Sequence, residues 1–283
     1  MELASRTRTV ALPKAISSLP PLPTVVVRAL QMVSNNDERL RQLHDVICAD
    51  PAFSVELLKL ANSPLYGIST EIRSTLQAAI LMGYERLKGI VLTVGMRSYL
   101  GDALHLPALR ASWRHSLACA MIAEELAAVS AIDKDVAYTA GIIHDIGRLA
   151  LIASDTRKYE QVAKCEGPGA ADYLQKEREV FGIDHCQAGE ALVIAWRLPF
   201  EFIEITSRHH EHTEDGLFDT LAVVKSSCAT ADALGFGFRP APADRNCGEI
   251  LGRAPAYERL LLLPQPEELA SRIDRKIQCM DSM

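Results

Sequence analysis

The stretch Gly141-Ile142-Ile143-His144-Asp145-Ile146-Gly147 places a histidine and an aspartate side by side inside an apolar segment of helical length. Burying two polar side chains in such a segment costs free energy unless they find partners. An imidazole beside a carboxylate suits zinc, iron, manganese or nickel as a ligand pair, rather than calcium. These seven residues therefore predict a buried helix that carries part of a metal site.

The sequence on either side of this stretch follows the helical period nearly throughout, and strand patterns are sparse. We expect helices at about 24–34, 38–48, 51–61, 74–82, 85–100, 111–130, 135–153, 185–197, 199–212 and 217–234. Two short helical stretches should follow the Gly/Pro-rich loop 235–248, the last of them docked through Leu269, Ile273 and Ile277. The pattern predicts an all-α fold.

Breaks in this pattern suggest how the chain is organised. Residues 1–16 read as an N-terminal arm, and 17–105 as a helical subdomain without a chemical motif. A seam at 101–109 leads into a histidine-bearing core, 106–213, and 214–283 form a C-terminal helical extension. The two helical parts are expected to pack together at the seam.

Composition narrows the classes of function. The chain has 283 residues, of which 48% are hydrophobic, and a net charge of −6 with both signs mixed along it, so a nucleic acid is not expected as the main partner. Seven dispersed cysteines without a CxxC pair predict reduced thiols. There is no signal-peptide pattern and no uninterrupted apolar run of about 18 residues, which predicts a cytoplasmic protein with no membrane span.

Histidines on apolar helix faces are the strongest functional signal. The chain has eight histidines, and five point with apolar stripes: His115, His144, His185, His209 and His210. Any one of them alone is more simply explained as a buried histidine bonded to a backbone carbonyl. Five on four helices, together with Asp145, match the way helical bundles build metal sites from facing helices. We therefore expect these six residues to converge in one pocket.

Several longer motifs resemble the HDOD family, a branch of the HD phosphohydrolase superfamily related to the HD-GYP phosphodiesterases. The resemblance covers about 17–213 and is weaker to about 237. Its N-terminal motifs are Leu19-Pro20-Pro21-Leu22-Pro23, Asp50-Pro51-Ala52-Phe53 and Leu60-Ala61-Asn62-Ser63. Its core motifs are Arg114-His115-Ser116, Gly141 to Leu149, Phe181-Gly182-Ile183-Asp184-His185, Trp196-Arg197-Leu198-Pro199 and His209-His210.

The resemblance implies an HD-domain-like helical bundle with an additional N-terminal helical subdomain. It also implies one or two divalent transition metal ions, Fe, Mn, Ni or Zn. By position, His115, His144 and Asp145 match the superfamily's first ligands. His185, His209 and His210 match the extra ligands of HD-GYP enzymes.

Three positions depart from the superfamily's pattern. The final aspartate ligand falls at Cys228, or at Asp232 if the alignment slips. No GYP motif follows His210, which argues against hydrolysis of cyclic di-GMP. Arg148 stands where a lysine often holds phosphate, and arginine is not a neutral replacement.

Two functions of different classes follow from the resemblance. The first is a bacterial signal-transduction regulatory or output module with little or no catalytic activity, which contacts a protein partner. The alternative is a metal-dependent phosphohydrolase or phosphodiesterase acting on a nucleotide or other phosphoester, with Asp145 and Arg148 as catalytic residues. A metal or redox sensor stays open as a third, because histidine and carboxylate also hold iron.

Overall fold

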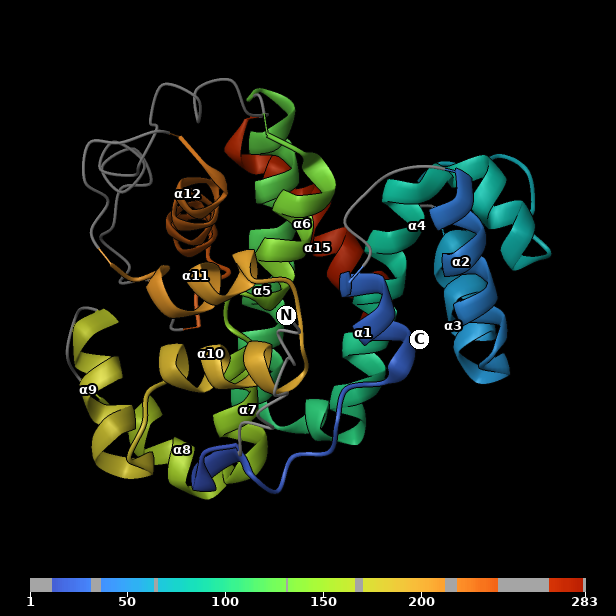
Figure 1. Cartoon of the computed structure of the whole chain (residues 1–283). Coiled ribbons are helices and arrows are strands. Elements are labelled where there is room, and N and C mark those ends of the chain that lie inside the picture. The colour runs from blue at the N-terminus through green and yellow to red at the C-terminus, as the bar shows by residue number, and fades with distance from the viewer. Residues whose placement is uncertain are drawn as a thin grey trace, which may run out of the picture.

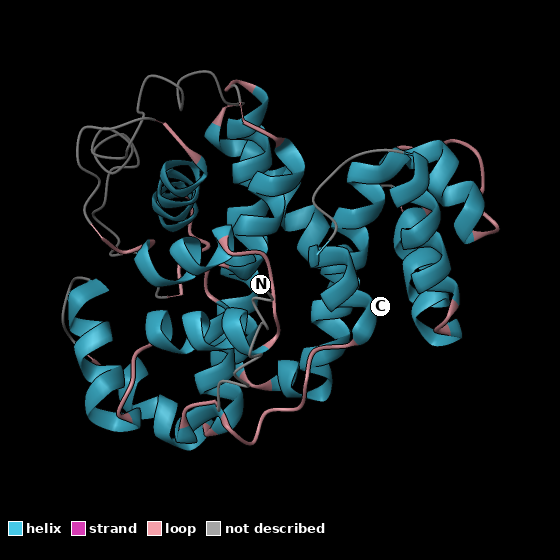
Figure 2. Ribbon diagram, in the orientation of Figure 1, coloured by secondary structure: helices cyan, strands magenta, loops and turns pink. Residues whose placement is uncertain are grey.

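Helices supply all the regular secondary structure of the part of the chain that the structure describes (Figure 2). The structure is a computed structural model, and it describes residues 12–31, 37–63, 66–130, 132–165, 170–211, 218–238 and 265–281. The prediction of an all-α fold is therefore confirmed. Residues 1–11 of the expected arm and most of the Gly/Pro-rich loop lie outside the described residues, as does the first of the two closing helical stretches.

The N-terminal part is built from α1 (Thr24–Gln31), α2 (Asp37–Cys48), α3 (Pro51–Ala61) and α4 (Thr75–Leu100). The helix expected at 51–61 forms as α3, and Asp50 caps it: its side chain accepts a hydrogen bond from the Phe53 amide at 3.0 Å, and Pro51 follows it. The two helices expected on either side of Gly83 form the single element α4, kinked at Gly83 (φ 75°). A positive φ is costly for a side-chain-bearing residue, so glycine permits this kink.

The second part contains the remaining helices. They are α5 (Pro107–Ala128), α6 (Lys134–Ile143), α7 (Ile146–Ser154), α8 (Thr156–Ala163), α9 (Ala170–Phe181), α10 (His185–Ala195), α11 (Glu201–Arg208), α12 (Thr220–Ala233) and α15 (Pro266–Asp281). In Figure 1, α8 to α12 lie on one side, α2 to α4 on the other, and α5 and α6 between them. Short 3-10 turns at Lys14–Ile16 and Gly101–His105 precede α1 and α5.

The single helix expected at 135–153 is wrong, because the chain breaks at its centre. α6 ends at Ile143 and α7 begins at Ile146, and Asp145 takes a non-helical backbone conformation (φ −105°, ψ 19°). The turn aims the side chains of His144 and Asp145 into the core instead of along one continuous helix. Helical periodicity does not reveal such a break, because the apolar residues on both sides keep a helical pattern.

Glycines at both ends of this turn let other helices approach it closely. A Cβ atom on Gly141 would lie 2.4 Å from the Ala120 Cα atom of α5, and one on Gly147 would lie 1.9 Å from the His185 carbonyl oxygen of α10. Helix packing therefore brings α5 and α10 into backbone contact with the two sides of the turn, each carrying a histidine toward it.

The last helix docks as the sequence predicts. Leu269, Ile273 and Ile277 are buried, each at most 2% exposed, on one stripe of α15. Lys276 beside them is also buried, and its Nζ atom donates to the Tyr138 hydroxyl at 3.0 Å. This narrow stripe is sufficient to dock α15 against α5.

One stretch, Lys134–Ser154, is long and apolar enough on average to cross a membrane. Of its most hydrophobic window, 89% is buried inside the protein, as it is in the core helices of globular proteins. The turn at His144 and Asp145 also interrupts it. Its composition is accounted for by its place in the core.

Candidate metal centre

The six residues expected to converge lie together, and they come from distant parts of the chain. His115 is on α5, His144 and Asp145 form the α6–α7 turn, His185 opens α10, and His209 and His210 follow α11. Neighbouring ring centroids are close: 5.4 Å for His115–His144, 5.1 Å for His144–His209, 4.2 Å for His209–His210 and 5.0 Å for His185–His210. Whether they bind metal stays a prediction.

Three overlapping groups of potential ligands can be distinguished, and the one that links the other two consists of His144, Asp145 and His209. Of those other two, we call the first the thiol cluster: His115, Cys119, His144 and Cys228. The second, the histidine cluster, consists of His185, His209 and His210. Within each group one ligand atom per residue lies within 4.8 Å of all the others. Asp145 lies between the two, with Oδ1 3.4 Å from His185 Nε2 and 3.8 Å from His209 Nε2.

The ring nitrogens are held in a manner that suits metal ligands. His144 Nδ1 pairs with the Gly141 carbonyl at 2.8 Å, and His209 Nδ1 pairs with the Ile205 carbonyl at 3.1 Å. A carbonyl can only accept, so each Nδ1 carries the proton and each Nε2 offers a lone pair. Both Nε2 atoms and both Asp145 carboxylate oxygens are buried without a hydrogen bond. Arg148 places a positive charge 3.3 Å from one Asp145 oxygen, whereas the two Nε2 lone pairs have no donor, so these residues fit a metal ion.

Glu177 orients His185, a role that no pattern in the sequence predicted. Its Oε2 atom lies 2.6 Å from His185 Nδ1 and also accepts from the His185 amide at 2.8 Å. The Tyr159 hydroxyl donates to Oε1 at 2.7 Å, so the carboxylate is held on both sides. A carboxylate behind a histidine fixes which ring nitrogen faces a metal. No local motif marks Glu177, because α9 meets α10 only after folding.

Arg148 is buried within the centre, 7% exposed. One terminal nitrogen lies 3.2 Å from His185 Nε2 and 3.4 Å from His210 Nε2, and the other lies 3.3 Å from an Asp145 oxygen. Its Cζ atom lies 5.2 Å from the centre of the Phe238 ring. The guanidinium thus contacts the candidate metal ligands. That it binds a phosphate stays a prediction.

The final ligand position of the superfamily could fall at Cys228 or at Asp232, and the distances within the site favour Cys228. Cys228 Sγ lies 3.8 Å from Cys119 Sγ, within the thiol cluster. Asp232 approaches His115 from outside: its Oδ1 atom is 3.7 Å from Nδ1, and its side chain is 54% exposed. The same Nδ1 also faces the Phe236 carbonyl at 3.2 Å, so His115 presents Nε2 to the cluster. Cys228 therefore occupies the inner position.

Electrostatics divide the histidines into two kinds. Burial disfavours the charged forms of His115, His185, His209 and His210. At His185 the Glu177 carboxylate outweighs burial and raises the pKa to about 10, and at His115 the hydrogen bond with Cys228 raises it to about 9. At His209 burial and the charges of its histidine neighbours lower the pKa to about 3, and burial also lowers the pKa of His210.

The pKa values of two other groups follow from their neighbours. Burial would raise the pKa of Asp145, but the Arg148 guanidinium and the surrounding histidines hold it well below its usual range. A hydrogen bond from Cys119 is the largest cause of the lowered pKa of Cys228. These neighbours favour the ionised forms of Asp145 and Cys228.

In the metal-free protein, the depressed pKa values of His209 and His210 should make folding acid-sensitive. Unfolded histidines take up a proton near pH 6.5, whereas folded His209 does so only near pH 3. Below about pH 6.5 the unfolded state therefore binds more protons, and stability falls by about 1 kcal/mol per pH unit for each such group. His185 is protonated in both states below pH 6 and adds nothing to this slope.

Denaturant unfolding of chelator-treated protein at pH 7 and pH 5 measures this effect. The matched control is His209→Gln, which cannot take up a proton and should show a shallower loss of stability. Equal losses in the wild type and in His209→Gln would show that His209 is not held neutral by the fold.

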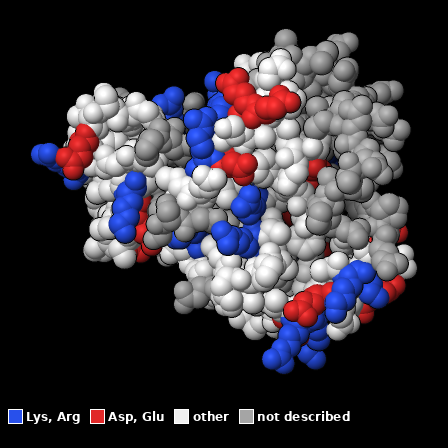
Figure 3. All heavy atoms as spheres, turned by 180° about the vertical axis from the view of Figure 1, so that it is seen from behind, with Lys and Arg blue, Asp and Glu red and all other residues white. Residues whose placement is uncertain are grey.

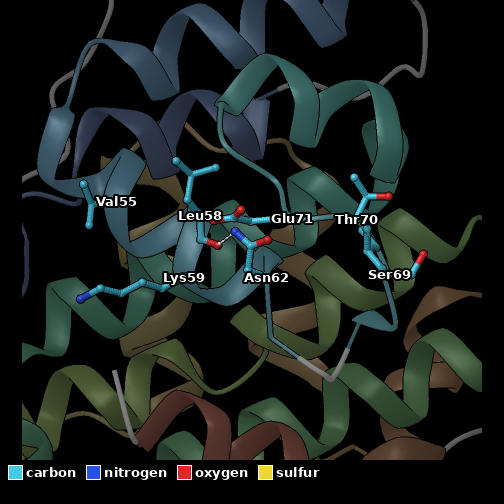
Figure 4. A pocket seen from close by; sticks show the side chains of 8 residues that line it. Val55, Leu58, Lys59, Asn62, Ser69, Thr70 and Glu71 are labelled. Atoms are coloured by element: carbon cyan, nitrogen blue, oxygen red, sulfur yellow. Dashed lines mark hydrogen bonds between the residues drawn. The ribbon is translucent and has the colours of Figure 1, made fainter.

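A separate hollow of about 560 Å³ lies in the N-terminal part, against α3 (Figure 4). Asn62 closes one wall: its amide donates to the Leu58 and Ile72 carbonyls at 3.0 and 2.7 Å, and its oxygen accepts from the Ile72 amide at 2.7 Å. The asparagine of the motif Leu60-Ala61-Asn62-Ser63 thus ties the following loop to the end of α3, which is a structural role.

An all-helical core with a histidine–aspartate turn at its centre defines the HD class of helical domain. Residues 19–212 match the HDOD domain, so this chain belongs to the HDOD family. The family prediction is confirmed.

Solved structures share the fold. An HDOD domain protein of unknown function from Geobacter sulfurreducens superposes with a TM-score of 0.70 at 23% identity, covering 94% of this chain and 93% of that one. A "Putative phosphohydrolase" from Shewanella amazonensis SB2B gives 0.68 at 20% identity, covering 98% of both. A "Putative signal transduction protein" from Marinobacter aquaeolei VT8 gives 0.70 at 20% identity, covering 93% of this chain and 60% of that one.

Among curated sequences, an uncharacterized protein of Treponema pallidum (strain Nichols) is 22% identical over 202 residues. The match takes in 69% of this chain and spans 38% of that relative's length.

Proposed function

We propose that this chain is a regulatory output module of bacterial signal transduction, whose HD-type centre has little or no phosphohydrolase activity and which works in the cytoplasm. The observation that carries the proposal is the position of Arg148. Its guanidinium is a permanent cation, and it lies among Asp145, His185 and His210, the groups that would otherwise face a second metal ion. An ion there would have to displace a buried, ion-paired arginine.

The position of Arg148 among these ligands also affects whether the centre can catalyse hydrolysis. Metal-assisted hydrolysis needs a metal-bound water aimed at phosphorus and groups free to meet the phosphoryl oxygens. Arg148, the residue expected to hold phosphate, is instead turned onto the ligands and is 7% exposed. Cys228 in place of a carboxylate also replaces a hard oxygen ligand with a soft one. Both features favour binding and structure over turnover.

We also propose that this module binds a protein partner. On the face shown in Figure 3, basic and acidic side chains alternate in small groups among the described residues, unlike the continuous basic stripe that nucleic acid binding requires. In the N-terminal part, Leu76 and Ile80 lie one turn apart on α4 and are 52% and 69% exposed. The mixed charge and the exposed apolar side chains support a protein as the partner rather than a nucleic acid.

A metal-dependent phosphohydrolase is the second candidate, and one observation favours it. Both Asp145 oxygens are buried without a hydrogen bond beside His144 and His209, as they would be in a centre that holds metal for chemistry. A phosphoester of a nucleotide or another small molecule would then be the substrate.

The rate of phosphoester hydrolysis distinguishes the regulatory module from the phosphohydrolase. We expect wild-type protein with added manganese, iron or nickel to hydrolyse bis(p-nitrophenyl) phosphate and cyclic dinucleotides far more slowly than about 1 per second, the low end of ordinary enzymes. Asp145→Ala is the matched control. Faster turnover that Asp145→Ala abolishes would make the chain a hydrolase.

The variant Arg148→Ala tests whether the Arg148 guanidinium keeps a second metal ion out of the centre. Removing the guanidinium should let the histidine cluster and Asp145 bind one more manganese ion per chain than the wild type, counted by elemental analysis after gel filtration. Arg178→Ala is the control, because Arg178 pairs with Asp184 at 2.7 Å, outside both clusters. Equal metal content in the wild type and in Arg148→Ala would show that the guanidinium does not exclude a metal ion. The proposal of little or no hydrolysis would then lose its main support.

A further inference from the structure

We infer that His115, Cys119, His144 and Cys228 form a closed, four-ligand zinc site that fastens α5 and α12 to the α6–α7 turn. The proposal concerns the thiol cluster alone. It deepens the proposed function, because His115, His144 and Cys228 are among the ligands expected for the HD-type centre; the new ligand is Cys119, and Asp145 is left out of the set.

Spacing is the first argument. A tetrahedral zinc ion with Zn–S near 2.3 Å and Zn–N near 2.05 Å sets its ligands about 3.8 Å apart for two sulfurs and about 3.6 Å apart for sulfur and nitrogen. Cys119 Sγ lies 3.8 Å from Cys228 Sγ and 3.5 Å from His115 Nε2. These two separations, both measured from Cys119 Sγ, match the edges of a tetrahedral zinc site.

The orientation of the two rings is the second argument. His115 Nδ1 faces the Phe236 carbonyl at 3.2 Å, and His144 Nδ1 faces the Gly141 carbonyl at 2.8 Å. Each imidazole therefore directs its Nδ1–H to a backbone carbonyl and its Nε2 atom into the cluster. His144 Nε2 is buried and has no hydrogen-bond partner. Backbone carbonyls behind metal-binding imidazoles fix rings in this way.

Burial is the third argument. Cys119 is 0% exposed, His144 1% and His115 6%. Cys228 on α12 is partly buried. Desolvated sulfur and nitrogen donors on α5 and on the α6–α7 turn cost free energy to gather unless an ion compensates them. With four protein ligands, no position is left for water, which is the arrangement of structural rather than catalytic zinc.

The donor set selects the metal. Thiolate ligands favour zinc over manganese and magnesium, which prefer oxygen. Cys119 lies one helical turn after His115 on α5, so a single helix supplies half of the set. A disulfide between the two cysteines is a different state, because a sulfur–sulfur bond is about 2.05 Å long and these atoms lie 3.8 Å apart.

The experiment begins with wild-type protein grown with zinc and purified under reducing conditions without chelator. We expect one zinc ion per chain by elemental analysis. Exchange of that zinc for cobalt(II) should produce the intense visible bands of a tetrahedral ion, together with near-ultraviolet sulfur-to-cobalt charge transfer. These spectra need no variant and no turnover.

Variants then assign the ligands. Cys119→Ala and Cys228→Ala should weaken zinc binding by more than about 100-fold, the upper end of the loss for groups that only orient a ligand. Cys186→Ala is the matched control, because Cys186 is a buried free cysteine outside the cluster. Circular dichroism of each variant reports whether it folds.

Several outcomes would overturn the site. Cobalt spectra without sulfur charge transfer in folded wild-type protein would exclude thiolate ligands. Zinc content in Cys119→Ala equal to that in Cys186→Ala would exclude Cys119. A Cys119–Cys228 disulfide that persists in protein purified under reducing conditions would show that the two sulfurs are bonded to each other and are not zinc ligands. Turnover tests the proposed function and zinc content tests the thiol cluster, so either can fail alone.

Discussion

Gly147→Ala is expected to lower the free energy of unfolding by about 3 kcal/mol, at the upper end of the cost of overpacking a core. The added Cβ atom would lie 1.9 Å from the His185 carbonyl oxygen and 2.5 Å from the Gly189 amide nitrogen. Both are backbone atoms, so no rotamer change can relieve the overlap. α7 and α10 would have to separate, and His185 would move with α10.

Denaturant unfolding of the two proteins measures this loss. Gly89→Ala is the matched control: its Cβ atom would meet only the Tyr138 ring, at 3.4 Å, and alanine favours the helix by up to about 1 kcal/mol. We expect Gly89→Ala to be neutral or stabilising. A Gly147→Ala protein as stable as the wild type would mean that α7 and α10 do not make backbone contact at this point.

Asp135→Asn should destabilise the protein by about 3 kcal/mol, as breaking one side of a buried ion pair does. Lys88 Nζ on α4 lies 2.7 Å from Asp135 Oδ2 on α6, and the side chains are 4% and 8% exposed. The variant removes the negative charge and leaves the lysine ammonium in the interior. The pair also joins the N-terminal part to the core, so α4 should loosen from α6.

Thermal and denaturant unfolding measure the effect, and an exposed pair provides the control. Lys176 and Glu179 lie 3.0 Å apart on α9 with side chains 38% and 51% exposed, so Glu179→Gln should cause no measurable change. The double variant Lys88→Met/Asp135→Leu should recover much of the loss, because it buries no unbalanced charge. Equal effects of Asp135→Asn and Glu179→Gln would show that the Lys88–Asp135 pair is not desolvated.

The helical fold and most of the centre could be predicted from local patterns. Helical periodicity alone predicts the fold class, because it records which face of each segment is buried. The inward faces of His115, His144, His185, His209 and His210 follow from their register with apolar neighbours. The motifs of the HDOD resemblance add the family. Each of these inferences uses residues within a few turns of one another.

Other features needed the packed helices. The break at His144 and Asp145 has no periodic signature, and Glu177 reaches His185 only because the chain turns between α9 and α10. Cys119 and Cys228 are 109 residues apart and become neighbours only when α12 packs on α5.

Sequence alone thus determined the kind of elements and which residues face inward, since both depend on local backbone geometry. Only the tertiary structure decided which inward-facing groups meet. Arg148 shows the difference: its sequence position suggested phosphate, yet packing places its guanidinium against His185 of α10 and against His210, which follows α11. The physical reason is that the partners of a buried charge are set by the distances between helices, which no single segment encodes.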